Sequence, residues 1–337
     1  MKRLDRLITT ELSAWVQQAK TQAEQGQVPD RIPQLALADS GWFAVHIWCK
    51  SGKNISFGDT ARVFPLMSVI KTFSLLYLLE NFGAETVFGW VGVEPSDAPF
   101  NSLEQLISDR GHPRNPMINS GAITLSNKLP GKDANQRTLL FCQWLNQLAG
   151  CQLSLDEEML ASVRLTRSKA NEAIANYLAQ AGHLENIETA LDTYEQICCI
   201  SGRVEDLALL GKLLACENSC LSPQNRRIVN AVMSNCGLYE ASAEFAVRIG
   251  LPMKSGIGGG LVAIVPGEGA IACYSPALDR VGNPIAGLVF VEALAQELQL
   301  SPMTQKKSDL FHFSAASTSL QGITKSCFLW LLHLFFG

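Results

Sequence analysis

The sequence lacks several features that would each indicate a particular class of protein. Its 337 residues carry a formal net charge of −4, and the absence of a basic excess argues against nucleic acid or an anionic membrane as the main partner. Residues 1–20 read as an amphipathic helix rather than a secretory segment, because Glu11, Gln17 and Gln18 interrupt the apolar residues. No internal repeat or long linker separates independent domains. We therefore expect a cytoplasmic protein that recognises a small molecule or another protein.

Disulfide and metal-binding patterns are missing as well. The ten cysteines are spread along the chain, and none falls in paired CxxC spacing with histidines nearby. Two close pairs, Cys198 with Cys199 and Cys216 with Cys220, are typical of packing. We expect mostly buried, reduced thiols, as in an intracellular protein.

Strand patterns lie towards both ends of the chain, and helical patterns lie between them. Residues 41–59 predict a β-hairpin, and strand signals return at 258–275. Apolar residues at helical spacing predict helices over 68–82, 137–149, 170–181, 187–197, 204–216, 224–235 and 284–299. This order predicts an α+β fold with an antiparallel sheet formed from both chain ends, flanking helices and a helical subdomain. A site would lie in the crevice between the two parts.

The chain is long and apolar enough, with 47% hydrophobic residues, to bury one large core. We predict a single catalytic domain over residues 1–300. Its sheet part covers about 26–65 and 245–300, and its helical part about 66–244.

A tail of unassigned role follows, over residues 301–337. Its end, 327–336, is strongly apolar but too short to span a bilayer. It would cap a groove, pack on another subunit or touch a membrane surface, and the sequence does not decide among these.

The four-residue motif Ser68-x-x-Lys71 has the residue types of a nucleophile and its base. Ser68 and Lys71 are three residues apart at the start of an apolar helix, so they share a face of that helix. A lysine desolvated among apolar neighbours has a lowered pKa and can activate a serine hydroxyl. The motif by itself favours the simpler interpretation of an N-cap serine followed by a surface lysine.

A second motif favours the catalytic interpretation of Ser68 and Lys71. Lys254-Ser255-Gly256 opens a glycine-rich run directly before a predicted strand, which is the placement of the Lys-Ser/Thr-Gly element of serine β-lactamases and penicillin-binding proteins. A β-turn with a bulge is the alternative interpretation. Asn119, in the polar segment 110–123, can both donate to and accept from an amide substrate.

Further motifs extend the comparison along most of the chain. They are Glu94-Pro95-Ser96, Pro99-Phe100-Asn101-Ser102, Asn115-Pro116-Met117-Ile118-Asn119, Ser234-x-Cys236-Gly237-x-Tyr239, Gly250-Leu251-Pro252-x-Lys254-Ser255-Gly256 and Ser275-Pro276-x-Leu278-Asp279. In this order, from about residue 26 to about 299, the chain resembles the serine-dependent glutaminase family. The resemblance implies a β-lactamase/penicillin-binding-like fold and hydrolysis of L-glutamine to L-glutamate and ammonia, without metal or organic cofactor. We also expect a homo-oligomer, a dimer or a tetramer.

The resemblance assigns catalytic roles to four residues. Ser68 matches the nucleophile and Lys71 its base. Tyr239 matches a residue that holds the substrate and relays a proton beside the serine. The backbone N–H groups of Ser68 and Ile257 would form the oxyanion hole, with Ile257 where the family usually has valine.

The resemblance also assigns substrate contacts to Asn119, Asn171 and Tyr194, with Lys254 and Ser255 as supporting residues. Taken singly, these side chains have ordinary structural interpretations. The tyrosines can be core residues with satisfied hydroxyls, and Asn171 can be the N-cap of the helix that follows it.

Three departures from the family pattern concern the substrate pocket. Arg31 replaces a tyrosine that reaches the substrate, and Met67 replaces a glutamine before the nucleophile. The family glutamate that binds the α-ammonium group is lost, because Val163 or Arg164 occupies its position. Residues that would supply a substitute carboxylate from a neighbouring turn are Glu158 and Glu172.

Three functions therefore remain open. The first is a glutaminase with a rearranged α-amino pocket. The second is an amidohydrolase with the same Ser68 chemistry and another substrate, whose anionic group would pair with Arg31 or Arg164. The third is a catalytically weak binding protein that has kept the fold.

Overall fold

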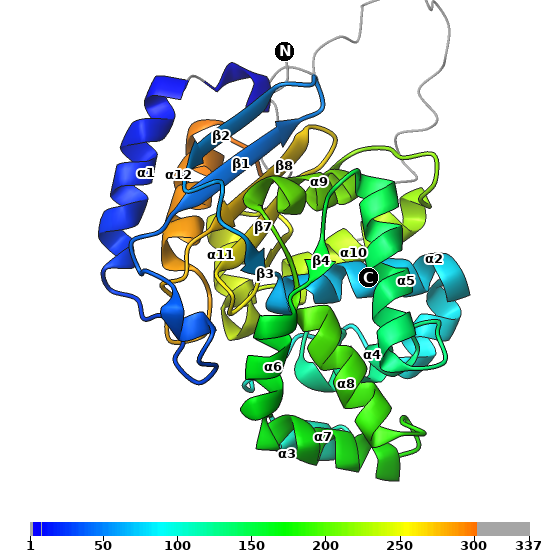
Figure 1. Cartoon of the computed structure of the whole chain (residues 1–337). Coiled ribbons are helices and arrows are strands. Elements are labelled where there is room, and N and C mark those ends of the chain that lie inside the picture. Colours follow the sequence, from blue (N-terminus) through cyan, green and yellow to red (C-terminus); the bar gives the residue numbers. More distant parts are fainter. Residues whose placement is uncertain (1–2, 8, 302–337) are drawn as a thin grey trace, which may run out of the picture. The chain divides into compact units, whose positions relative to one another are not determined.

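The computed structural model describes residues 3–7 and 9–301, and strands from both parts of the chain form one antiparallel sheet in it (Figure 1). The order is β2-β1-β8-β7-β6. The strands are β1 (Ala44–Cys49), β2 (Asn54–Gly58), β6 (Met253–Ser255), β7 (Gly260–Val265) and β8 (Gly269–Tyr274). Early and late segments meet between β1 and β8, where Ala44 pairs with Tyr274 and Cys49 with Gly269. The predicted α+β class is confirmed.

Helices bury both faces of this sheet (Figure 1). Leu261 and Ala263 of β7 belong to a core with α1 (Thr9–Ala23) and α12 (Ile285–Glu297). Val262 and Ile264 belong to the opposite core, which includes α9 (Val204–Ala215). Because both faces are covered, β7 is apolar at successive positions instead of alternating with polar residues.

The middle of the chain is helical, as predicted. Its helices before α9 are α2 (Ile70–Trp90), α3 (Leu103–Ser108), α4 (Asn119–Asn127), α5 (Ala134–Ala149), α6 (Glu157–Leu165), α7 (Lys169–Gln180) and α8 (Ile187–Cys198), and those after it are α10 (Pro223–Cys236) and α11 (Ser242–Arg248). The sequence pattern does not predict α3, α4, α6 or α11, since helices of six to nine residues hold too few turns for a clear period. The predicted end of the first helix near residue 82 coincides with a break inside α2, where Gly83 has a φ of 78°.

Short 3₁₀ helices and a small second sheet complete the fold. The single-turn 3₁₀ helices are η1 (Leu4–Arg6), η2 (Leu35–Leu37), η3 (Met67–Val69) and η4 (Tyr239–Ala241). A small sheet has the order β3-β5-β4, from Phe64–Pro65, Ile200–Gly202 and Ser154–Leu155. The Phe64 ring stacks on Tyr274 of β8 with centroids 4.4 Å apart, which ties the small sheet to the large one.

The predicted tail lies outside the described residues, except for Ser301. None of the helices in residues 3–301 is long and apolar enough to cross a membrane.

The position of Phe64 predicts a large effect on stability. The side chain is 2% exposed and lies four residues before Ser68, so Phe64→Ala should lower the free energy of unfolding by about 3–5 kcal/mol. Val63→Ala is the control, because Val63 is 60% exposed and should change it by less than about 0.5 kcal/mol. Urea denaturation measures both, and equal effects would contradict the role given to the stack.

Candidate functional site

Ser68 lies in η3, in a turn held by close backbone contacts. Met67, just before it, has a φ of 45°, a left-handed conformation that is strained for a side chain of this size. A Cβ at position 256 would lie 2.7 Å from the Leu66 carbonyl oxygen and 3.1 Å from the Ser68 nitrogen. Gly256 is therefore required for the approach of the glycine-rich run to this turn, which brings Ile257 beside Ser68.

Two backbone N–H groups at this contact can bind an anion. Val69 donates to the Leu66 carbonyl oxygen at 2.9 Å. Among the turn and loop hydrogen bonds of residues 3–7 and 9–301, by contrast, none uses the N–H of Ser68 or Ile257. Both groups are thus able to donate hydrogen bonds to an oxyanion beside Ser68.

Lys71 is completely buried, one turn along from Ser68. Its Nζ donates to the Met117 carbonyl oxygen at 3.1 Å and to Asn119 Oδ1 at 2.7 Å. Burial lowers the pKa of Lys71 from 10.5 to about 8, because the charged form loses its hydration. Two of the three N–H directions of the ammonium are occupied, which leaves the third for a group such as Ser68.

A chain of side-chain hydrogen bonds leads away from Lys71. Asn119 is the first residue of α4, and its Oδ1 also accepts from the Tyr194 hydroxyl at 3.1 Å. Its Nδ2 donates to Asn171 Oδ1 at 2.8 Å. The N-cap of α7 is Ser168, not Asn171, so the interpretation of Asn171 as a cap is wrong. Three residues that the sequence pattern selected thus lie in one network.

Tyr239 is buried next to Ser68. Its φ of 56° is left-handed, and its hydroxyl lies 3.5 Å from the Ser255 carbonyl oxygen. Burial raises the pKa of Tyr239 to about 12, against the smaller opposing effect of hydrogen bonds with Ser68 and Ser255. Tyr239 therefore keeps its proton at neutral pH.

Lys254 and Ser255 lie behind Tyr239. Lys254 Nζ donates to the carbonyl oxygens of Gly237 and Ser255, at 2.9 and 2.7 Å, and lies 4.3 Å from the centre of the Tyr239 ring. Ser255 Oγ donates to Asn283 Oδ1 at 2.6 Å. Neither side chain lines the cavity beside Ser68, so both can act only by positioning the turn and the tyrosine.

A cavity of about 320 Å³ opens over this network. Of the predicted residues, its wall contains Arg31, Met67, Ser68, Asn119, Val163, Asn171, Tyr194 and Ile257. Of the two candidates for the lost glutamate position, Val163 is the one that lines the cavity. Among the residues that the structure describes, no group of three or more His, Cys, Asp or Glu side chains could hold a metal ion.

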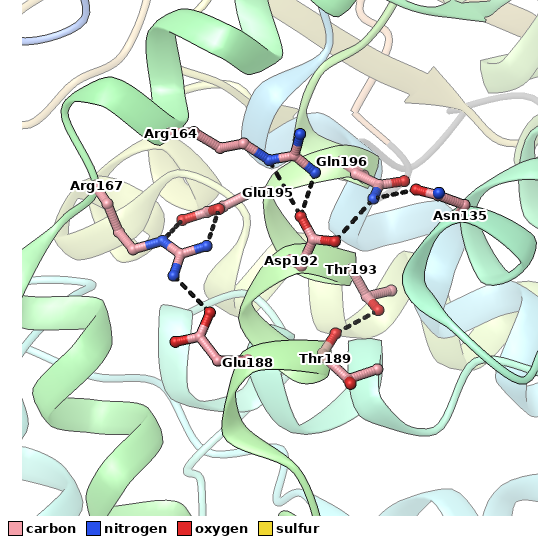
Figure 2. Close-up of polar contacts among 9 residues, drawn as sticks. All are labelled: Asn135, Arg164, Arg167, Glu188, Thr189, Asp192, Thr193, Glu195 and Gln196. Atoms are coloured by element: carbon pink, nitrogen blue, oxygen red, sulfur yellow. Dashed lines mark hydrogen bonds and ion pairs between the residues drawn. The ribbon is translucent and has the colours of Figure 1, made fainter.

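Arg164 does not reach this cavity. Its guanidinium binds Asp192 at 2.5 Å (Figure 2) and lines a second cavity instead. The expectation that Arg164 pairs with an anionic substrate group in this site is therefore corrected. The reason is helical geometry, because neighbouring residues of α6 point in directions about 100° apart.

The cavity wall also contains a carboxylate that the sequence reasoning missed. It belongs to Glu195, whereas Glu158 and Glu172 do not line the cavity. The only available signal was the place of Glu195 directly after Tyr194 in the chain. A residue that follows a cavity residue on a helix usually points elsewhere, so the pattern did not select it.

Comparisons with known proteins identify relatives of this chain. A family model described as Glutaminase matches residues 26–302. A glutaminase of Synechocystis sp. is 46% identical over 294 residues, which cover 86% of this chain and 90% of that protein. Glutaminase 2 of Bacillus subtilis is 34% identical, with 86% and 97% covered.

A solved structure extends the similarity to the fold. It is the covalent complex of a Bacillus subtilis glutaminase with 5-oxo-L-norleucine, formed by reaction of that protein with 6-diazo-5-oxo-L-norleucine. The two chains superpose with a TM-score of 0.79 and 29% identity, over 87% of this chain and 99% of the other.

Proposed function

The chain belongs to the glutaminase family, and on that premise we propose that it hydrolyses L-glutamine to L-glutamate and ammonia with Ser68 as the nucleophile. The observation that carries the proposal is the position of Ser68 in the cavity wall, three residues before the buried Lys71 and in hydrogen-bond contact with the buried Tyr239. The covalent complex that the structurally similar Bacillus protein forms by reaction with 6-diazo-5-oxo-L-norleucine supports a nucleophilic mechanism.

Lys71 is the base in the proposed first step. In its neutral form it takes the Ser68 proton as Oγ attacks the side-chain amide carbon. The carbonyl oxygen becomes an oxyanion, which the N–H groups of Ser68 and Ile257 bind. Tyr239 passes a proton to the departing nitrogen and is reprotonated from Lys71, so the products are the acyl-enzyme and ammonia.

Water completes the cycle. It attacks the acyl carbon and gives its proton to Lys71, and collapse of the second oxyanion returns the proton to Ser68 and frees glutamate. Asn119 and Asn171 are placed to bind the substrate alongside this reaction, since both line the cavity next to Tyr194. Lys254 and Ser255 position Tyr239 and the turn.

A related amidohydrolase with another substrate is the second candidate. Arg31 lines the cavity in place of the family tyrosine, and Val163 supplies no charge. Ammonia release from L-glutamine, D-glutamine, asparagine and glutamine analogues lacking the α-ammonium distinguishes the candidates. Preference for L-glutamine supports glutaminase, preference for the analogues supports the second candidate, and no release from any supports a binding protein.

We also infer a cytoplasmic homo-oligomer, a dimer or a tetramer, which binds no nucleic acid. The nine cysteines in the described part of the chain are all free thiols, which suits a reducing compartment. Exposed apolar side chains at Leu139, Leu165 and Val247 offer surface for subunit contacts. Sedimentation velocity measures the oligomeric state directly.

The mechanism predicts that Ser68→Ala and Lys71→Ala each lower kcat/KM for the true substrate by at least about a thousandfold. Each variant removes one member of the attacking pair, so the double variant should lose little more than either single one. Ser126→Ala is the control, because Ser126 Oγ donates only to the Ala122 carbonyl oxygen at 2.8 Å. Near wild-type ammonia release by Ser68→Ala would refute the mechanism.

The pKa of Lys71 predicts the pH dependence of the reaction. Burial lowers it to about 8, so the neutral base accumulates as the pH rises through 8 and is lost as the pH falls. We expect kcat/KM to fall about tenfold per pH unit below that value, to about one hundredth at pH 6. Initial rates measure this while fluorescence confirms that the protein stays folded. A flat profile between pH 6 and 9 would exclude Lys71 as the base.

A further inference from the structure

The described cavity wall contains one carboxylate, from Glu195, and one guanidinium, from Arg31. Free L-glutamine carries an ammonium and a carboxylate on the same carbon atom, several bonds away from the amide that reacts. A cavity that takes this molecule out of water must offer a partner to both charges, because an unpaired buried charge is strongly disfavoured. The two charged residues of the wall match the two charges of an α-amino acid.

Glu195 is held in place by a fork of hydrogen bonds (Figure 2). Its side chain is 5% exposed. Arg167 donates from Nε to Oε1 and from Nη2 to Oε2, both at 2.9 Å. Such a side-on pair fixes the plane of the carboxylate. Each carboxylate oxygen can accept a second hydrogen bond, so the fork leaves acceptor capacity unused.

Arg167 does not neutralise this site fully. Its Nη1 donates to Glu188 at 2.8 Å, so one guanidinium serves two carboxylates (Figure 2). The side chain of Glu188 is 75% exposed, and Glu188 does not line the cavity. The three side chains together carry a formal charge of −1, and their buried member is Glu195.

We propose that Glu195 binds the α-ammonium group of the substrate and that Arg167 is its positioning residue. The proposal rests on the glutamine hydrolysis inferred above and names the residue that selects an amino acid over a plain amide. In this proposal the negative charge that binds the ammonium group comes from α8. Val163 of α6 contributes only an apolar surface to the same wall.

The place of Arg31 agrees with this assignment. Its Nη1 donates to the carbonyl oxygen of Thr166 at 3.3 Å. Thr166 lines the cavity and directly precedes Arg167, which holds Glu195. The carboxylate of Glu195 and the guanidinium of Arg31 thus reach the cavity beside the same short segment, residues 166–167. The two charges of an α-amino acid are attached to one carbon atom, so their partners must lie close together in this way. Arg31 is the partner for the substrate's α-carboxylate in this arrangement.

The test compares two substrates on each variant. One is L-glutamine, and the other is 4-carbamoylbutanoate, which keeps the amide and the carboxylate but lacks the ammonium group. Glu195→Gln keeps the size of the side chain and removes its charge. We expect it to lower the preference for L-glutamine over 4-carbamoylbutanoate by about 10- to 100-fold, mainly through KM for L-glutamine. The ratio of kcat/KM values is unaffected by any loss of folded protein.

Glu188→Gln is the matched control. It removes the same charge from the other side of Arg167, outside the cavity, and should leave the preference within about threefold of wild type. Glu195→Asp, which keeps a charge on a shorter side chain, should give an intermediate preference and covers the case in which Glu195→Gln does not fold.

The outcomes separate this proposal from the proposed function. If Glu195→Gln slows both substrates equally, Glu195 has only a structural role and the proposal is wrong. An unchanged preference overturns it as well. If the wild-type protein releases no ammonia from L-glutamine, the proposed function itself fails.

Discussion

The complete burial of Lys71 without an acidic partner constrains the structure around it. No carboxylate contributes to the shift of its pKa, and the loss of hydration is the dominant cause. A buried amine of this kind must be held by dipoles, and here these are the Met117 carbonyl and the Asn119 amide. The segment from residue 115 to the start of α4 therefore has to present two oxygens to one nitrogen atom.

The asparagine-rich motif before α4 meets that requirement. Asn115 Oδ1 accepts from the N–H groups of Met117 and Ile118, at 2.9 and 3.2 Å, which orders the turn whose carbonyl faces Lys71. Gly121 permits the turn to lie on α4, because a Cβ there would be 2.0 Å from the Asn115 carbonyl oxygen. The motif Asn115-Pro116-Met117-Ile118-Asn119, which resembles the family pattern, thus has a local structural role. It supplies the backbone and amide oxygens that accept hydrogen bonds from Lys71.

The sequence was sufficient to predict the sheet and most helices, and it selected Ser68 and Lys71 as the proposed attacking pair. These features depend on short-range patterns, such as alternation, helical period and the three-residue spacing of Ser68 and Lys71. Glu195 and Arg164 could not be placed in this way. Whether a residue lines a cavity depends on how a helix is rotated against its neighbours, and a one-residue error turns a side chain by about 100°. Arg164 and Val163 differ by that single step and face different cavities.

The rotation of α8 about its axis determines which of its side chains line which cavity. This helix presents Tyr194, Glu195 and Cys198 to the cavity beside Ser68, and Asp192 and Gln196 to the second cavity. Arginines from the segment before α7 bind acids on both sides, since Arg164 pairs with Asp192 and Arg167 with Glu195 (Figure 2). Apolar packing sets the rotation of α8, because Ala190, Leu191 and Ile197 of this helix are buried in the core. The two ion pairs then hold α8 against the segment before α7.

The reacting groups and the charged groups of the cavity consequently come from different parts of the fold. Ser68 is set by η3 and its contact with the glycine run before β7, so its geometry depends on the sheet. Glu195 is set by α8 and Arg167, so its geometry depends on the helical part. In the proposed site, α6 presents Val163 and α8 presents the carboxylate of Glu195, and neither helix carries the proposed nucleophile. Binding preference is for that reason freer to change in this fold than the chemistry of the attack.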